Sequence, residues 1–99
     1  MPHRTTERTA TSLTLLARAL AKENRLAEAH ELLQHAVQIQ ERVFGNDDPN
    51  VASAVNELGS VAMQRGQHAE AVADFQRIAH IYRSVYGGKH YLIGIALAN

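Results

Sequence analysis

The histidines are the residues whose chemistry first suggests catalysis or metal binding. The chain has six of them, and His30 and His35 flank a glutamate, Glu31. A zinc-protease helix needs two histidines four residues apart on one face, with a glutamate between them. Here the two histidines are five residues apart, which turns the second about 140° away from the first on an α-helix. The spacing therefore predicts no metal site, only exposed or half-buried histidines on a long helix.

The glycines, serines and cysteines also fail to form a catalytic motif. The six glycines are dispersed, so no glycine-rich phosphate loop is present. The serines have neither a nucleophile elbow nor a histidine and aspartate in register with them. Cysteine is absent, which excludes disulfides and thiolate zinc sites. We therefore predict no catalytic residues, no metal and no cofactor, and the chain is not expected to be an enzyme.

The charge balance argues against nucleic acid and membrane partners. Ten Lys and Arg residues match ten Asp and Glu residues, so no long-range field would attract an anionic polymer or lipid surface. No segment approaches the length of about 18 apolar residues that a membrane span requires. A chain of 99 residues without cysteine suits one small domain, or a fragment of a larger protein, in a reducing compartment. We expect a cytoplasmic location.

An internal repeat organises the sequence. Val-Phe-Gly at residues 43–45 recurs as Val-Tyr-Gly at 85–87, and Ala-Glu-Ala at 27–29 recurs at 69–71. Both pairs are 42 residues apart. The matched positions are mostly apolar or turn residues, which are the positions that stacked helical hairpins must keep constant. The register therefore predicts repeated supersecondary units.

Each copy has the periodicity of two helices joined by a tight turn. Asn24 and Gly66 occupy the same slot of the two copies, and both residue types can adopt the left-handed conformation that ends a helix. Gly45, Asp48 and Pro49 then supply a stop, a cap and a first-turn residue between the copies. Helices are predicted at about 5–22, 26–43, 50–64, 68–85 and 91–99. The stripes expected to be buried on the first helices are Leu13, Leu16, Ala17 and Leu20 in one copy and Val55, Leu58, Gly59 and Ala62 in the other.

These residues resemble a known family. Val55, Leu58, Gly59 and Ala62, followed by Ala71 and Phe75, are similar to the tetratricopeptide signature. The 42-residue spacing exceeds the usual period of about 34 and resembles the longer repeats of kinesin light chains and bacterial signalling proteins. The resemblance implies an all-α fold, a right-handed superhelical stack of antiparallel helical hairpins. In the sequence we assign residues 1–8 to an N-terminal extension, 9–50 and 51–92 to two repeats, and 93–99 to a truncated third. Leu58 and Phe75 are expected to be buried.

The resemblance also implies where a ligand would lie. First helices of successive hairpins line a concave groove that receives a peptide or a partner segment. Thr11, Leu15, Ser53 and Gln64 point away from the apolar stripes, on the side of the first helices that would face this groove. The groove residues predicted to carry binding are Thr14, Arg18, Lys22, Asn56, Glu57, Ser60, Met63 and Asn99.

Two functions remain open from the sequence. The first is a protein-interaction scaffold that binds a peptide or protein partner, as a piece of a larger signalling or regulatory protein. The alternative is a structural spacer or a homo-oligomerisation segment without a peptide ligand. Leu92, Ile93, Ala96 and Leu97 are clustered apolar residues of the last predicted helix, so a homodimer through this C-terminal helix is expected.

Overall fold

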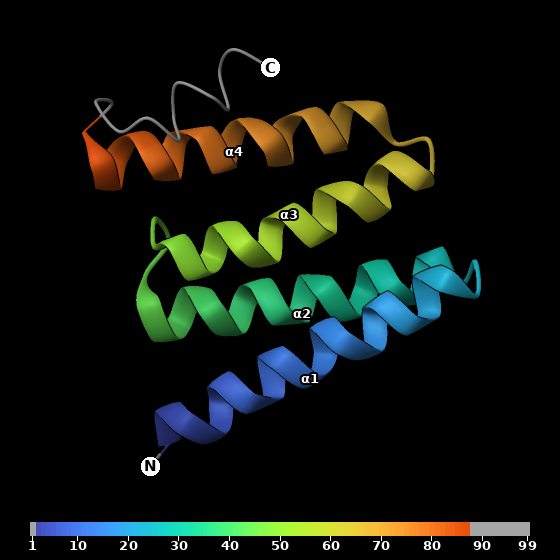
Figure 1. The fold of residues 1–99 in the computed structure, drawn as a ribbon, viewed down its shortest axis with the longest axis horizontal. Helices are drawn as coiled ribbons and strands as arrows, with labels where there is room; N and C mark the ends of the chain where they lie inside the picture. The colour runs from blue at the N-terminus through green and yellow to red at the C-terminus, as the bar shows by residue number, and fades with distance from the viewer. Residues whose placement is uncertain (1, 88–99) are drawn as a thin grey trace.

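Four α-helices form two antiparallel hairpins in the computed structural model (Figure 1). The structure describes the backbone of residues 2–87 and the side chains of residues 8–87. The helices are α1 (Pro2–Lys22), α2 (Leu26–Phe44), α3 (Pro49–Gln64) and α4 (His68–Tyr86). The prediction of an all-α stack of helical hairpins is confirmed. The fifth predicted helix, at 91–99, and the C-terminal dimer contact lie outside the described residues.

The two hairpin turns close in the same way. Asn24 and Gly66 have φ of 63° and 77°, the left-handed conformation predicted for that slot. In each turn the next amide reaches back to a carbonyl of the preceding helix: Arg25 N–H donates to Leu20 O and Gln67 N–H donates to Ala62 O, both at 2.9 Å. Equivalent residues of the two repeats therefore make equivalent hydrogen bonds.

The connection between the hairpins uses the cap that the sequence predicted. Gly45 ends α2 with φ of 93°, and Pro49 occupies the first turn of α3. The Asp48 side chain accepts a hydrogen bond from Asn50 N–H at 2.8 Å, which satisfies one of the free amides at the start of α3. α1 begins at Pro2 instead of near residue 5, because proline is accommodated in a first helical turn.

Helix α2 lies between α1 and α3, and the core forms on both of its sides (Figure 1). Leu33 is 1% exposed and Val37 is 6% exposed, and they share one apolar cluster with Val55 and Leu58 of α3. Leu58 was predicted to be buried and is, with 9% of its surface exposed. The other buried members of the cluster are Ala17, Ala29, Val51, Ala52, Ala54, Val61 and Ile81.

Two residues that were predicted to be buried are not. Leu16 is 51% exposed, although its equivalent 42 residues later is the buried Leu58. The reason is that α3 packs against α2 of the preceding hairpin, whereas in the described part of the chain nothing takes the corresponding place beside α1. Phe75 is 37% exposed, although its ring lies close to Gly59 of α3. The prediction of burial was therefore wrong for Leu16 and only half correct for Phe75.

The Phe75 ring lies against Gly59. A Cβ placed on Gly59 would come within 3.1 Å of two ring carbons, closer than side chains normally approach. In the first repeat the equivalent pair is Ala17 and Leu33, both buried. The second repeat thus combines a larger residue on α4 with a smaller one on α3, which keeps the helix contact filled.

A polar cluster bridges α2 and α4 at the seam between the hairpins. His30 is 8% exposed, so the prediction of exposed or half-buried histidines was wrong here, and its Nε2 lies 3.1 Å from Glu70 Oε1. The Asp74 carboxylate lies nearby, and its Oδ2 is buried without a hydrogen-bond partner among the described residues. Burial, together with the negative charge of Glu70, raises the pKa of Asp74, although His30 and Arg77 oppose the shift. Arg77 also donates to Glu41 of α2.

The Gly59 and Phe75 contact predicts a double-mutant coupling. In a Phe75→Leu background, Gly59→Ala should be more favourable than in the wild type, because alanine is the better helix former by about 1 kcal/mol and the ring no longer obstructs its methyl group. The Asp74 Cβ, 3.2 Å from the position of that methyl group, is present in both backgrounds. In the wild-type background the same substitution should be less favourable by about 1 kcal/mol or more, because the methyl group overpacks against the ring. Urea unfolding of the four proteins measures the coupling. Equal effects in both backgrounds would contradict the proposed contact.

Because the pKa of Asp74 is raised, removing its charge is predicted to stabilise the fold by an amount that depends on pH. A carboxyl group whose pKa is higher in the folded chain than in the unfolded chain, where it is about 3.9, favours folding while it is protonated. This stabilising contribution is complete below the unfolded pKa and is lost as pH rises through the folded pKa. Asp74→Asn should therefore raise the melting temperature at pH 7, and this increase should disappear below a pH of about 3.9, where the wild-type carboxyl group is protonated. Glu31→Gln, which removes an exposed carboxylate from α2, is the control. A lower melting temperature for Asp74→Asn at pH 7 would show that the charge is needed.

Candidate functional site

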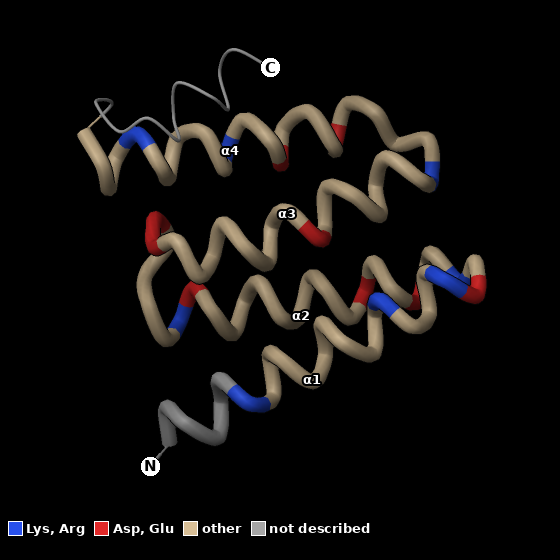
Figure 2. The backbone as a smooth tube through the Cα atoms, viewed as in Figure 1, with Lys and Arg blue, Asp and Glu red and all other residues tan. Residues whose placement is uncertain are grey.

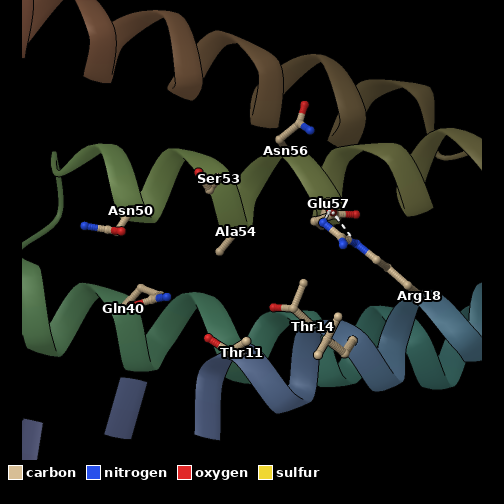
Figure 3. Close-up of a pocket in the computed structure, with 10 residues that line it drawn as sticks. Thr11, Thr14, Arg18, Gln40, Asn50, Ser53, Ala54, Asn56 and Glu57 are labelled. Carbon is tan, nitrogen blue, oxygen red and sulfur yellow. Dashed lines mark hydrogen bonds and ion pairs between the residues drawn. The ribbon is translucent and has the colours of Figure 1, made fainter. Parts of the chain in front are cut away.

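A cavity of about 370 Å³ lies between α1 and α3 (Figure 3). Its walls come from the facing sides of the two first helices, and α2 closes part of it from below. The lining is mainly hydroxyl, amide and charged side chains: Thr11, Thr14, Leu15 and Arg18 of α1, Gln40 of α2, and Asn50, Ser53, Ala54, Asn56 and Glu57 of α3.

A second cavity of about 250 Å³ follows the first and shares Arg18 and Glu57 with it. Its lining is more apolar and also includes charged and polar side chains: Ala17, Arg18, Ala21, Lys22, Leu33, Glu57, Ser60, Val61 and Gln64. The two cavities together form what we call the α1–α3 groove. The groove exists because α1 and α3 both pack on α2 and barely touch each other.

An ion pair between Arg18 and Glu57 crosses the groove where the two cavities meet (Figure 3). Arg18 Nε donates to Glu57 Oε1 at 2.8 Å, and Nη2 donates to the same oxygen. This hydrogen bond, and then the attraction between the two charges, raises the pKa of Arg18. The Arg18 side chain is 56% exposed, so water screens the pair and its contribution to stability is small.

The first cavity carries no net charge. Among the described residues that line it, Arg18 and Glu57 are the only ionisable ones, and their charges cancel. Among the described side chains, α1 carries only basic charges and α3 only an acidic one, whereas α2 and α4 carry both signs (Figure 2). A ligand in this cavity would therefore be held by hydrogen bonds and shape more than by a charged field.

Hydrogen-bonding groups in the first cavity are only partly used by the fold. Thr14 Oγ1 donates to Ala10 O at 3.0 Å, and Asn50 Nδ2 donates to Asp48 Oδ1 at 2.8 Å. By contrast, the side chains of Thr11, Ser53 and Asn56 make no hydrogen bond to any other described residue. Hydroxyl and amide groups both donate and accept, so these three can match either partner on a ligand.

Six of the eight predicted groove residues line these cavities. Thr14, Arg18, Asn56 and Glu57 meet in the first, and Lys22 and Ser60 in the second. Met63 is 47% exposed but lies toward the hairpin turn, where its sulfur is 3.3 Å from His68 Nδ1, and it lines neither cavity. Asn99 lies outside the described residues.

Gln40 and Asn50 were missed by the sequence analysis. Gln40 belongs to a second helix, yet it follows Leu33, Ala36 and Val37 at the spacing of the buried stripe. A polar residue in an apolar register was the signal that could have identified it. Its Oε1 is buried and lacks a hydrogen-bond partner among the described residues. Asn50 is placed in the groove by the Asp48 cap, which holds both its backbone and its side-chain amide.

The described residues offer no other obvious chemical site. Among them, no three His, Cys, Asp or Glu side chains gather closely enough to hold a metal ion. Nor does any helix within residues 2–87 combine the length and the hydrophobicity needed to cross a membrane.

Comparison with known proteins identifies the repeats. The family model described as tetratricopeptide repeat matches residues 9–50 and, a second time, residues 51–91. No curated protein matches the sequence. Repeats of this kind are generally non-enzymatic scaffolds that mediate protein–protein interaction. Two consecutive matches, the paired hairpins and their shared turn geometry all agree, and the chain belongs to the tetratricopeptide repeat family.

Proposed function

We propose that the chain is a protein-interaction module that binds an extended peptide segment of a partner in the α1–α3 groove. The observation that carries this proposal is the elongated groove between α1 and α3, in which Thr11, Ser53 and Asn56 present hydrogen-bonding groups that the fold leaves unused. A concave site with a few convergent polar groups is the usual form of a binding site.

The chemistry of the first cavity matches a peptide backbone. Each residue of an extended peptide offers one N–H donor and one C=O acceptor. The Asn56 amide can satisfy both, and the hydroxyls of Thr11 and Ser53 can satisfy either. The Arg18 and Glu57 pair leaves this cavity electrically neutral, which suits the uncharged backbone.

The second cavity suits a side chain of the bound peptide. Ala17, Leu33 and Val61 belong to its apolar wall, and the small side chains of Ala21 and Ser60 also line it. A peptide that crosses the Arg18 and Glu57 pair would place its backbone in the first cavity and an apolar side chain in the second. The hydrophobic contact would add to the affinity, and the hydrogen bonds would fix the register.

The proposal predicts that groove variants lose peptide affinity without losing stability. Peptides selected on the wild-type chain from a phage-displayed random library serve as the probe. Asn56→Ala and Ser53→Ala should each weaken binding by about two- to tenfold, the equivalent of one net hydrogen bond of about 0.5–1.5 kcal/mol. Both residues are exposed, so helicity and melting temperature should not change.

Asn46→Ala is the matched control, because Asn46 is an exposed asparagine in the loop between the hairpins and lies outside both cavities. It should bind the selected peptides as the wild type does. Selection of peptides whose affinity is unchanged by Asn56→Ala and Ser53→Ala would place the site elsewhere. Failure to select any peptide would favour the role of a structural spacer.

A further inference from the structure

The ion pair between Arg18 and Glu57 borders both cavities of the α1–α3 groove (Figure 3). It joins α1 to α3, which otherwise barely touch, and within the described part of the chain no second ion pair links these two helices. A peptide that occupies both cavities must therefore pass over this pair. The residue of the peptide that crosses it meets the only charged groups of the first cavity among the described residues.

The repeat fold does not require this pair. A shift of 42 residues converts Arg18 into Ser60 and relates Glu57 to Leu15, so the repeat pattern contains no ion pair at these positions. The Arg18 side chain is 56% exposed, and an exposed pair adds little to stability. Neither the repeat nor the stability of the fold accounts for two opposite charges held together across the groove, and both side chains are available to a ligand.

The pair has hydrogen-bonding groups that it does not use. Nε and Nη2 of Arg18 both donate to Oε1 of Glu57. The remaining nitrogen, Nη1, and the remaining oxygen, Oε2, make no hydrogen bond to any described residue. Oε2 is accessible, because the buried side-chain atoms without a partner belong to Gln40 and Asp74. The pair therefore offers a ligand donors from α1 and an acceptor from α3, next to each other.

A primary amide is the side-chain group that matches both halves of the pair. Its oxygen accepts and its nitrogen donates, so one asparagine or glutamine of a peptide can accept from Arg18 and donate to Glu57 together. A carboxylate would be attracted by Arg18 but repelled by Glu57, and a basic group would meet the reverse. An apolar side chain would cover the pair and leave its spare groups without water or a partner, which is costly.

We propose that the Arg18 and Glu57 pair selects peptides with an asparagine or glutamine at the residue that crosses it. This inference rests on the proposed function and names the class of peptide that the groove binds. The bound peptide has its backbone in the first cavity, its amide side chain over the pair and an apolar side chain in the second cavity. Hydrogen bonds to charged groups are stronger than those between neutral groups, so the pair contributes specificity although the first cavity has no net charge.

A substitution scan of bound peptides tests the selection. The probes are peptides selected on the wild-type chain from a phage-displayed random library, retained if Asn56→Ala weakens their binding. Each position of a probe is replaced in turn by asparagine, aspartate, lysine and leucine, and affinity is measured by isothermal titration calorimetry. At one position the aspartate, lysine and leucine peptides should each bind about tenfold more weakly than the amide peptide.

Removing one charge of the pair should switch the preference at that position. In Glu57→Gln the charge of Arg18 is no longer balanced, so the aspartate peptide should bind more tightly than the amide peptide. In Arg18→Gln the charge of Glu57 remains, so the lysine peptide should bind most tightly. Glu31→Gln is the control, because it removes an exposed carboxylate outside both cavities, and it should keep the amide preference.

Lys22 also lines the second cavity, and its charge could attract an acidic peptide on its own. The double variant Glu57→Gln with Lys22→Gln should therefore still prefer the aspartate peptide. Loss of that preference would assign the switch to Lys22 and overturn the proposal.

Two further results would overturn the selection alone. Probes that depend on Asn56 could have no position that requires an amide, as binding of only a peptide backbone would allow. The amide preference could also survive both Glu57→Gln and Arg18→Gln. The scan on the wild-type chain needs no variant of the pair, so it decides the matter even if a substitution disturbs folding. If no peptide is selected, or if none depends on Asn56, the proposed function fails and this inference fails with it.

Discussion

The burial of α2 between α1 and α3 is the interaction on which the rest of the structure depends. Leu33 and Val37 of α2 and Val55 of α3 are almost completely removed from water, and each such side chain contributes about 1.5–3 kcal/mol through its transfer alone. This contact sets the position of one hairpin on the other. Because both first helices rest on α2, they barely meet, and the α1–α3 groove is the space between them.

The same constraint separates the residues that stabilise the fold from those available for binding. The core consists of alanine, leucine, valine and isoleucine side chains on the inner sides of the helices. The groove side chains Thr11, Ser53 and Asn56 are exposed and make no hydrogen bond within the described residues, so the fold does not depend on them. Arg18 and Glu57 join α1 to α3, but their exposed pair stabilises the fold little. Groove residues can therefore differ between such repeats while the core is retained.

Much of this structure could be predicted from local sequence chemistry. The turns at Asn24 and Gly66, the cap at Asp48 and the burial of Leu58 follow from residue type and periodicity. The gathering of Thr14, Arg18 and Asn56 in one groove was expected from the resemblance to tetratricopeptide repeats. What failed depends on neighbours that a single helix does not reveal. Leu16 and Leu58 have the same place in the pattern, but within the described residues only Leu58 has a helix of another hairpin packed beside it. His30 is buried next to Glu70, a hydrogen-bond partner 40 residues later in the sequence. Gln40 lines the groove from α2, whereas the predicted groove residues lie on the first helices of the hairpins.

Native-state hydrogen exchange tests most directly whether the α2–α3 contact unites the two hairpins. If it does, the slowest amides of α2 and α3 should exchange only through global unfolding, with the same free energy and the same denaturant dependence in both helices. The ends of α1 and α4 should exchange faster, since within residues 2–87 each has a packed helix on one side only. Exchange of α1 and α2 as one unit, at a free energy distinct from that of α3 and α4, would contradict the account. It would mean that the hairpins fold independently and that the groove between them is not preformed.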